Sequence, residues 1–342
     1  MDFERAEKLI LQHLLNERKE DVYVLLSVQD LCVRDFIRVL DRLSSRGLVK
    51  VRNNTVVLSA RGVSAAKALG LRPAGRIRCS RCDGTGYTLP SSFHRVFEVF
   101  KRVVKGRPSP RESLDQKFIS AESVFRRVVF IHERGDLAGS RIFVVGDDDM
   151  LSLALALTHM PREVVAVDID DRVVDFINRI GEELRLPVRA SVYDVRNPLP
   201  KSFQKRFDVF VTDPTETIPA LRLFLSRATT ALRGKGCAGY FGMTTIESSI
   251  SKWRKLHQML YQMGLVVTDI RRDFSLYEET GESYRTPMAR RFGHPSTPWY
   301  RSAFVRVVAF TRITPLARGA VRINKRFYLD EESKPIAPPS MM

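Results

Sequence analysis

The chain has 342 residues, of which 44% are hydrophobic and 28% charged, so it is long enough for two domains with hydrophobic cores. No apolar run reaches the ~18 residues of a membrane-spanning helix and the charged N-terminus does not resemble a secretory signal, so we expect a cytoplasmic protein. The net charge of +17 is typical of proteins that bind nucleic acid, but residues 141–220 hold ten basic and fourteen acidic side chains, which favours a cationic ligand there.

Residues 1–75 are predicted to form a winged helix-turn-helix domain. Apolar residues at helical spacing predict a helix over residues 3–18, and two further helices are expected at about 27–32 and 33–47. Two short strands around Asn53-Asn54 then predict a hairpin. Such a domain can serve a structural or dimerising role, which we favour, or it can contact DNA.

Residues 76–115 are predicted to form a basic connector that contains a candidate metal site. Cys79 and Cys82 form a CxxC pair followed by a GxG sequence, in which the glycines let the backbone fold over the thiolates as in half of a zinc knuckle. A four-coordinate zinc or iron ion needs two more ligands, and the same pair from a second chain would complete the site in a homodimer. The alternative is a reduced cysteine pair that caps a turn.

From residue 141 onward the sequence alternates between strand and helix patterns. This alternation predicts an α/β domain over residues 116–325 with a Rossmann-like, doubly wound sheet of the class I methyltransferase type. Residues 326–342 are expected to form a flexible tail. The expected strands lie at residues 141–146, 163–168, 188–194, 207–213, 237–243 and 265–270, with a final strand at the end of the sheet from 302–313.

Acidic residues end four consecutive strands, where ligands bind in sheets of this kind. They are Asp147-Asp148-Asp149, then Asp168 with Asp170, then Asp194, and finally Asp213. A carboxylate at the end of the second strand commonly accepts hydrogen bonds from two ribose hydroxyls, and Asp194 is placed to reach an adenine edge. The pair indicates an adenosine-containing ligand. Any one of these residues could instead cap a helix, but that explanation fits four of them together poorly.

The loop Gly146-Asp147-Asp148-Asp149 indicates which adenosine compound is bound. A glycine-rich loop would let backbone amides approach a pyrophosphate, whereas three carboxylates repel phosphate. They also repel the methionine carboxylate of S-adenosylmethionine. When that carboxylate is removed, the remaining aminopropyl chain is cationic and sits on a cationic sulfonium, so the same loop attracts it. The sequence therefore favours decarboxylated S-adenosylmethionine as the co-substrate.

The fourth strand is followed by Asp213-Pro214-Thr215-Glu216-Thr217. Methyltransferases that act on adenine amino groups place an aromatic residue after Asp-Pro-Pro, where it stacks on the flipped base. Glu216 stands at that position here. A carboxylate at the reacting centre favours a cationic amine as the acceptor.

These motifs together resemble those of the archaeal branched-chain polyamine synthases, which are N(4)-bis(aminopropyl)spermidine synthases of thermophiles. The resemblance covers about residues 5–312 and includes VVGDDDMLSLALALT, the N-terminal domain, CxxCxGxG and DPTET. One position differs, because the family is expected to have DPPET where this chain has Thr215. The resemblance implies sequential aminopropyl transfer to the central secondary amine of spermidine, with release of methylthioadenosine each time.

The expected roles of the site residues follow from this reaction. An ammonium has no lone pair, so the attacking amine must lose a proton, and we expect Asp148 to orient the amine and accept that proton. Asp147 and Asp149 would help to hold ammonium groups. The donor side would comprise Gly146, Gln116, Asp168, Asp170 and Asp194. By the same resemblance, Asp213, Glu216 and Thr217 would line the acceptor side, and Tyr284, Trp299 and Tyr300 could cover the site by cation–π contact.

The main alternative is an S-adenosylmethionine-dependent nucleic-acid methyltransferase that docks through the winged helix. It explains the basic charge better but the two acidic motifs worse. A third possibility is a DNA-binding regulator whose Rossmann-like domain only senses a nucleotide.

Overall fold

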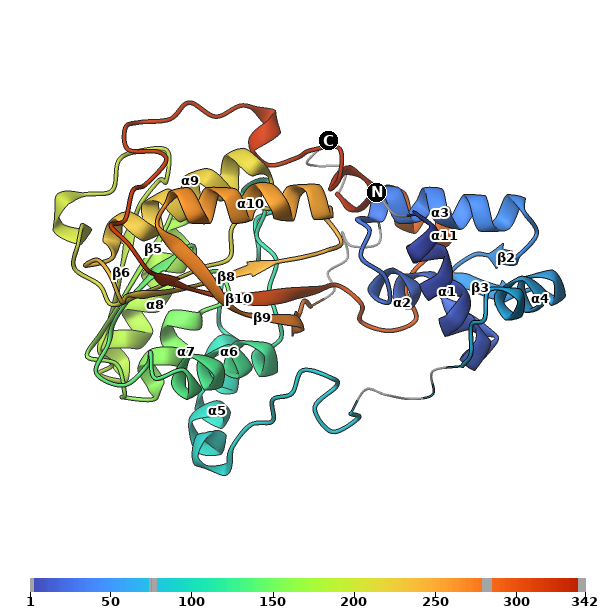
Figure 1. The fold of residues 1–342 in the computed structure, drawn as a ribbon. Coiled ribbons are helices and arrows are strands. Elements are labelled where there is room, and N and C mark those ends of the chain that lie inside the picture. The colour runs from blue at the N-terminus through green and yellow to red at the C-terminus, as the bar shows by residue number, and fades with distance from the viewer. Residues whose placement is uncertain (1–2, 74, 76–78, 279–284, 338–342) are drawn as a thin grey trace.

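The N-terminal part of the chain forms a unit of helices around a small antiparallel sheet with the strand order β1-β3-β2 (blue in Figure 1). The helices predicted at 3–18 and 33–47 and the hairpin are confirmed. The helix predicted at 27–32 is wrong, because Asp21 caps an earlier helix by accepting a 2.8 Å hydrogen bond from the Tyr23 N–H. The elements are α1 (Phe3–Glu17), β1 (Lys19–Asp21), α2 (Val22–Ser27), α3 (Val33–Ser45), β2 (Val49–Arg52), β3 (Thr55–Leu58) and α4 (Ala60–Ala68). The computed structural model describes residues 3–73, 75, 79–278 and 285–337.

The basic connector contains a helix that the sequence analysis did not anticipate, α5 (Ser91–Val104), before the short helix η1 (Glu112–Leu114). Its buried side chains Phe93, Phe97, Phe100 and Val104 recur at helical spacing. They join the core cluster that also holds Phe125. Part of the expected linker therefore belongs to the body of the large domain.

Seven strands form the main sheet, in the order β6-β5-β4-β7-β8-β10-β9. Strands β4 to β8 are parallel and β10 is antiparallel to both of its neighbours, which confirms the expected Rossmann-like sheet of the methyltransferase type. The last strand was expected at the end of the sheet but is inserted between β8 and β9. The strands are β4 (Arg141–Val145), β5 (Glu163–Asp168), β6 (Val188–Val192), β7 (Val209–Thr212), β8 (Ala238–Met243), β9 (Leu265–Leu276) and β10 (Arg301–Ala309).

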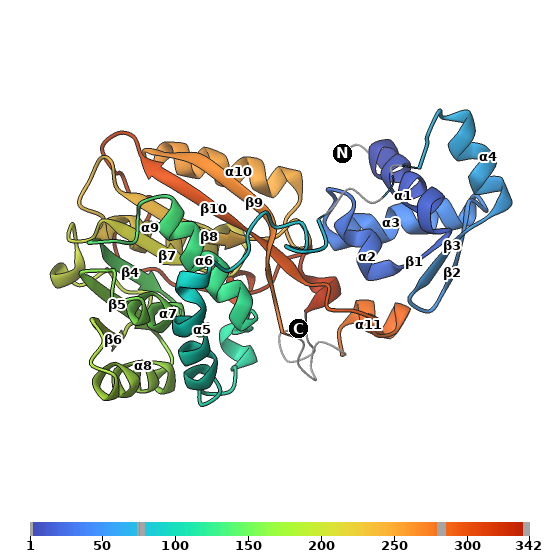
Figure 2. The same cartoon turned by 90° about the horizontal axis from the view of Figure 1, so that it is seen from below.

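Helices cover both faces of this sheet. Figure 1 shows α9 (Ile218–Ala231) and α10 (Ile250–Gln262) above it, and α6 (Ala121–Glu133), α7 (Leu151–Leu157) and α8 (Asp171–Glu183) below it; Figure 2 looks from the lower side. Successive strand residues face opposite layers, so Val144 belongs to the lower core and Val145 to the upper one. In the described part of the chain no helix is long and apolar enough to cross a membrane.

The N-terminal unit packs on loops of the large domain and on α11 (Pro287–Phe292). The Val33 N–H donates a 2.8 Å hydrogen bond to the Ile246 carbonyl, and Arg272 pairs with Asp30 at 2.6 Å. Tyr300 belongs to the same hydrophobic cluster as the N-terminal helices. The unit therefore supports the two segments that carry Glu247 and Tyr300, which are hydrogen-bonded to each other.

Residues 326–337, which the sequence assigns to a flexible tail, are packed against the large domain and include η5 (Lys334–Ile336). Phe327, at the end of η4 (Lys325–Phe327), is 4% exposed. Glu332 accepts a 2.7 Å hydrogen bond from the Ser249 N–H, and Lys252 pairs with Asp330 at 2.8 Å. These contacts were hidden in the sequence because the partners lie about eighty residues apart. Residues 338–342 lie outside the described part.

Candidate active site

A cavity lies at the carboxyl ends of β4, β5 and β7, where the strand order reverses. It brings together most of the strand-end residues singled out in the sequence. Five of the predicted site residues do not line this cavity themselves: Asp147, Asp149, Asp170, Glu216 and Thr217. The lining includes Asp115, Gln116, Gly146, Asp148, Asp168, Asp194, Asp213, Thr215, Phe224, Phe327 and Tyr328.

The loop after β4 is held by its own backbone and by Asp147. Gly146 has a φ of 74° and Met150 a φ of 60°, so the chain turns sharply at both ends of the three aspartates. The Asp147 carboxylate is 2% exposed and accepts bonds of 3.1 and 3.2 Å from the Ser152 N–H, at the start of α7. Asp147 therefore points at the helix rather than into the cavity.

Asp148 is the aspartate of this loop that lines the cavity. One carboxylate oxygen accepts a 3.1 Å hydrogen bond from the Lys117 N–H. Burial, and then the charges of Asp149 and Asp168, raise the pKa of Asp148 well above its ordinary value. Positive charge nearby favours the ionised form, so a bound cationic substrate would offset this shift and leave Asp148 a stronger base than an ordinary aspartate.

Asp149 and Asp213 share the buried guanidinium of Arg127, which the sequence analysis missed. Arg127 lies 2.8 Å from an Asp213 oxygen and 3.9 Å from an Asp149 oxygen, and it is 1% exposed. Asp213 also accepts a 3.1 Å bond from the Tyr277 hydroxyl. Burial raises the pKa of Asp149 to about 7 although Arg127 opposes the shift. Arg127 lies among the apolar residues of α6 that face the core. An arginine at such a position in the sequence could have indicated a buried partner for the carboxylates.

Asp168 is oriented by backbone donors at the end of β5. Its two oxygens accept 2.8 Å bonds from the Asp147 and Asp170 N–H groups, and burial raises its pKa. Asp170 is fully buried behind it and caps α8, where Arg172 donates to it at 2.6 Å. That bond lowers the pKa of Asp170. Gln116 lines the cavity and donates to Asp170 at 3.3 Å.

Asp194 lies on the far side of the cavity from the aspartate loop, after β6. Burial raises its pKa, but the hydrogen bonds and charge of Arg196 outweigh burial, so the pKa is lowered overall. Arg196 donates from its backbone N–H at 2.9 Å and from Nε at 2.6 Å. The neighbouring lining is aromatic, with Phe224, Phe327 and Tyr328. Two of these come from the segment that was expected to be a tail.

Glu216 is enclosed by the loop after β8. It accepts hydrogen bonds from the Thr244 N–H at 2.6 Å and the Ser248 hydroxyl at 2.6 Å. Burial, and then the charge of Glu247, raise the pKa of Glu216 to about 8. Thr217 is 2% exposed and caps α9, with its hydroxyl donating to the Phe327 carbonyl at 2.6 Å. The Thr217 side chain is therefore hydrogen-bonded to backbone groups.

Glu247 and the tyrosines beside it were not anticipated as a group. The Tyr300 hydroxyl donates to Glu247, and the Tyr300 ring contacts that of Tyr277 with centroids 4.9 Å apart. The Lys117 ammonium lies 3.9 Å from the Tyr300 ring centroid. Trp299, a suggested cover, packs instead on Tyr23 of the N-terminal unit at 4.7 Å. Tyr284 lies outside the described residues.

The cysteine pair does not line this cavity and lies in a hydrogen-bonded turn. Cys79 is exposed and Cys82 partly buried, and the Gly84 and Thr85 N–H groups donate to the carbonyls of Cys79 and Cys82 at 3.1 and 3.0 Å. Hydrogen bonds to the Cys79 sulfur, first from the Cys82 N–H and then from the Arg81 N–H, lower the pKa of Cys79. Within the described residues of this one chain, no three metal-binding side chains are grouped.

Comparison with known proteins gives consistent relatives. The chain matches the branched-chain polyamine synthase A C-terminal domain family over residues 95–335. It is 33% identical over 336 residues to an N(4)-bis(aminopropyl)spermidine synthase of Thermococcus kodakarensis, covering 97% of this chain and 95% of that protein. A second such synthase, of Methanocaldococcus jannaschii, is 37% identical over 312 residues, or 88% and 86% of the two chains.

A solved structure matches the fold almost throughout. It is the branched-chain polyamine synthase from Thermus thermophilus in complex with N4-aminopropylspermidine and 5'-methylthioadenosine. The TM-score is 0.84 and the identity 31%, with 96% of this chain and 93% of that chain covered.

Proposed function

The chain belongs to the branched-chain polyamine synthase family, and we propose that it moves aminopropyl groups from decarboxylated S-adenosylmethionine to the central secondary amine of spermidine. The products are N(4)-bis(aminopropyl)spermidine and methylthioadenosine. The observation that carries the proposal is the crowding of carboxylates at the strand ends, where Asp148, Asp168 and Asp213 line one cavity. This cavity is matched to cationic substrates.

The aspartate loop supports the choice of donor. Two unit charges ~4 Å apart interact by roughly 4 kcal/mol at an effective dielectric near 20. Asp148 would therefore repel the carboxylate of S-adenosylmethionine and attract the ammonium of the decarboxylated compound. On the other side of the donor, Asp168 would accept the ribose hydroxyls, and the aromatic lining near Asp194 would hold the adenine.

The reaction is a direct displacement at the carbon next to the sulfonium. The lone pair of the amine forms the new carbon–nitrogen bond, the carbon–sulfur bond breaks, and its electron pair stays on sulfur as methylthioadenosine leaves. We assign the proton of the attacking amine to Asp148, whose place in the cavity wall suits an acceptor once a cationic substrate favours its ionised form. Asp147 would hold the loop in place by accepting the hydrogen bond from the Ser152 N–H at the start of α7. Asp149 would balance part of the positive charge of Arg127.

The acceptor side would be formed by Asp213, Glu216 and Glu247. Burial raises the pKa of Glu216 to about 8 and also raises the pKa of Glu247. An ammonium group of a polyamine would draw both carboxyls toward the ionised form, because opposite charges stabilise each other at close range. Polyamine binding would then release protons from the site.

We assign the N-terminal unit to the winged-helix class, with domain limits near 1–75, and give it a structural role. Its order of elements, with a hairpin after the third helix, supports the class. The arginines of α3 are engaged within the unit: Arg34 and Arg38 pair with Asp35 at 3.1 Å, and Arg42 pairs with Glu7 at 2.9 Å. Side chains used in this way are poorly placed to contact DNA phosphates.

Cys79 and Cys82 fit a thiolate pair that would bind zinc or iron. Backbone N–H groups aimed at the Cys79 sulfur favour its thiolate, which is the form that binds metal. One chain supplies two ligands, so a homodimer in which two such pairs meet would complete a four-cysteine site. The metal would hold this turn and the interface and would take no part in the transfer.

The donor and the acceptor are tested together by mass spectrometry. The protein is incubated with spermidine and either S-adenosylmethionine or its decarboxylated form, and the amines are analysed. We expect additions of one and then two aminopropyl groups with the decarboxylated donor alone. Methyl groups found on added RNA or DNA, with no change in spermidine, would show that the proposal is wrong.

A further inference from the structure

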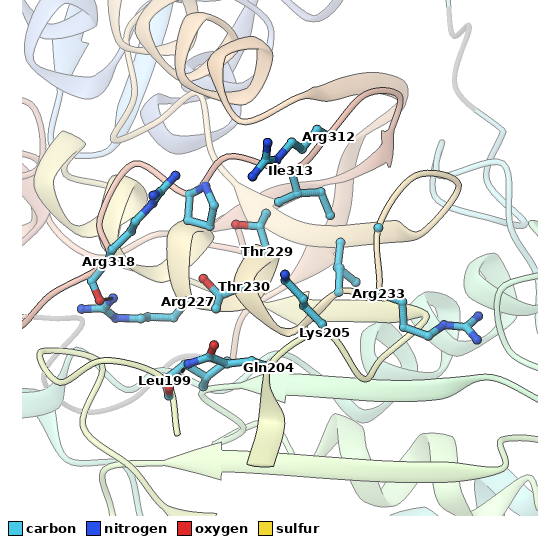
Figure 3. A pocket seen from close by; sticks show the side chains of 13 residues that line it. Leu199, Gln204, Lys205, Arg227, Thr229, Thr230, Arg233, Arg312, Ile313 and Arg318 are labelled. Atoms are coloured by element: carbon cyan, nitrogen blue, oxygen red, sulfur yellow. Dashed lines mark hydrogen bonds between the residues drawn. The ribbon is translucent and has the colours of Figure 1, made fainter. Parts of the chain in front are cut away.

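A second cavity, shown in Figure 3, lies near the amino ends of β7 and β8, whereas the candidate active site lies at the carboxyl ends of the parallel strands. Its volume is about 480 Å³, within the range of small-molecule sites. Helix α9 contributes Phe224 to the active-site cavity and Arg227, Thr229 and Thr230 to this one. The two cavities share no lining residue, so they are adjacent but distinct. The second cavity is lined by Leu199, Gln204, Lys205, Arg227, Thr229, Thr230, Leu232, Arg233, Gly234, Arg312, Ile313, Pro315 and Arg318.

Among the residues that the structure describes, the lining contains basic side chains and no acidic one. Figure 3 shows them coming from three segments: Lys205 precedes β7, Arg227 and Arg233 lie at the end of α9, and Arg312 and Arg318 follow β10. Positive charges held around one cavity repel each other, and an anion between them relieves that repulsion. This cavity is therefore suited to a negatively charged ligand.

Arg227 places a charge in the wall of the cavity without a carboxylate to balance it. It is 1% exposed, and burial lowers its pKa. Its guanidinium donates to backbone carbonyls, among them those of Val195 at 2.9 Å and Gly319 at 2.7 Å. Among the described residues no carboxylate lies within 4.0 Å of it. Such bonds hold the segment after β10 in place but leave the charge itself uncompensated.

Most of the other basic side chains that line the cavity also have no carboxylate partner among the described residues. Arg233 pairs with Asp208, whereas Lys205, Arg312 and Arg318 have no ion pair within the described part of the chain. The neighbouring cavity provides a contrast, because Asp136 and Asp208 lie among its arginines and neutralise part of their charge. The concentration of unbalanced positive charge is thus a property of this cavity.

We propose that this cavity binds a small molecule that carries several phosphate groups. Phosphates accept several charge-assisted hydrogen bonds at once, and arginines from three segments can donate them from different directions. The apolar side chains Leu199, Ile313 and Pro315 provide a wall for an uncharged part of the ligand, as in a nucleoside triphosphate. The concave shape favours such a compact ligand over the extended backbone of a nucleic acid.

The proposal is tested by calorimetric titration of the full chain with inorganic tripolyphosphate. This probe has no adenine that could enter the donor pocket. We expect wild type to bind it and the double variant K205Q/R312Q to bind it at least about tenfold more weakly, since two charge-assisted contacts are lost. The matched control is R61Q/K67Q, which removes the same charge from exposed positions on or beside α4 and should bind like wild type.

Two further arms identify the source of the phosphates. ATP, titrated with methylthioadenosine present to fill the donor pocket, should bind with the same dependence on Lys205 and Arg312. If K205Q/R312Q is unstable, Arg318→Gln replaces it and should weaken binding as well. The proposal is overturned if neither phosphate compound binds, if R61Q/K67Q weakens binding equally, or if single-stranded RNA binds through these residues and the small phosphates do not.

Discussion

At the scale of single residues, the three aspartates of the loop after β4 differ in what their carboxylates contact. Asp147 accepts from the Ser152 N–H, Asp149 faces Arg127, and Asp148 lines the cavity. The sequence predicted the acidic loop and its position correctly. It could not separate the three roles, because they depend on Ile119 and Arg127 in segments that precede the first strand of the sheet.

Asp148→Asn should lower turnover far more than donor affinity. The change keeps the shape of the side chain and removes the proton acceptor, so we expect a loss of about 10²–10⁴ in kcat. Asp168→Asn should instead raise the donor KM with less effect on kcat, because it weakens binding to the ribose. Steady-state kinetics with thermal melts check both. If Asp148→Asn keeps a near-normal kcat while Asp149→Asn is inactive, the assignment of the proton acceptor to Asp148 is wrong.

Glu216 should make stability depend on pH. Its pKa is about 8 in the folded chain against an ordinary value of 4.5, so between these values the folded state keeps a proton that the unfolded state has released. Stability contributed by this proton is complete below about pH 4.5 and is lost as pH rises to about 8. We therefore expect the wild-type Tm to fall over this interval.

Glu216→Gln is the matching variant for this pH effect. It should be less stable than wild type at pH 5.5, where protonated Glu216 is well accommodated, and the difference in Tm should shrink or reverse at pH 9. Thermal melts across this range measure it. A constant difference in Tm at all pH values would contradict a raised pKa for Glu216.

At the scale of elements, strand β8 shapes the site through a glycine. A Cβ on Gly242 would lie 1.8 Å from an Asp213 oxygen, so the absence of a side chain lets the Asp213 carboxylate lie across β8. From there Asp213 reaches both Arg127 and Tyr277. The sequence predicts strand β8 well, but it does not reveal that Gly242 must lack a side chain to make room for Asp213.

Gly242→Ala should displace Asp213 and reduce kcat/KM by about 10², the usual effect of a misplacement near 1 Å. Gly239→Ala is the control on the same strand, because its Cβ would meet the Phe210 ring at 2.1 Å, within the core. We expect it to lower Tm with less effect on the activity that remains. If the two variants show the same ratio of lost activity to lost Tm, Gly242 has only a packing role.

The elements that the sequence predicted best are those whose own pattern determines them. The parallel strands have continuous apolar runs, which are typical of strands covered on both faces. β10 has the same character and is central, whereas β9 alternates between apolar and charged residues and forms the edge. The central position of β10 could therefore have been predicted from its sequence. Helix α2 was not, because its start depends on the capping residue Asp21.

At the scale of the whole molecule, the net charge of +17 does not describe the transfer site. The acidic cavity lies at the carboxyl ends of the parallel strands and a basic cavity near the amino ends of β7 and β8, and α9 contributes residues to both. Much of the remaining positive charge is paired on the surface, as for Arg189 and Arg206 with Glu163. Composition alone favoured nucleic acid, because it averages over regions with opposite charge.

The cysteine pair belongs to this scale because the metal site proposed for it would need a second chain. Protein purified without chelator should contain about one zinc or iron ion per two chains, since each chain supplies two of four ligands. Cys79→Ser should remove the metal and weaken the dimer, and Ser80→Ala, in the same turn, should change neither. Metal analysis and sedimentation velocity measure the two quantities. Removing the metal with a chelator should have the same effect on assembly as Cys79→Ser. A metal content near zero, or a content that Cys79→Ser leaves unchanged, would contradict the shared site.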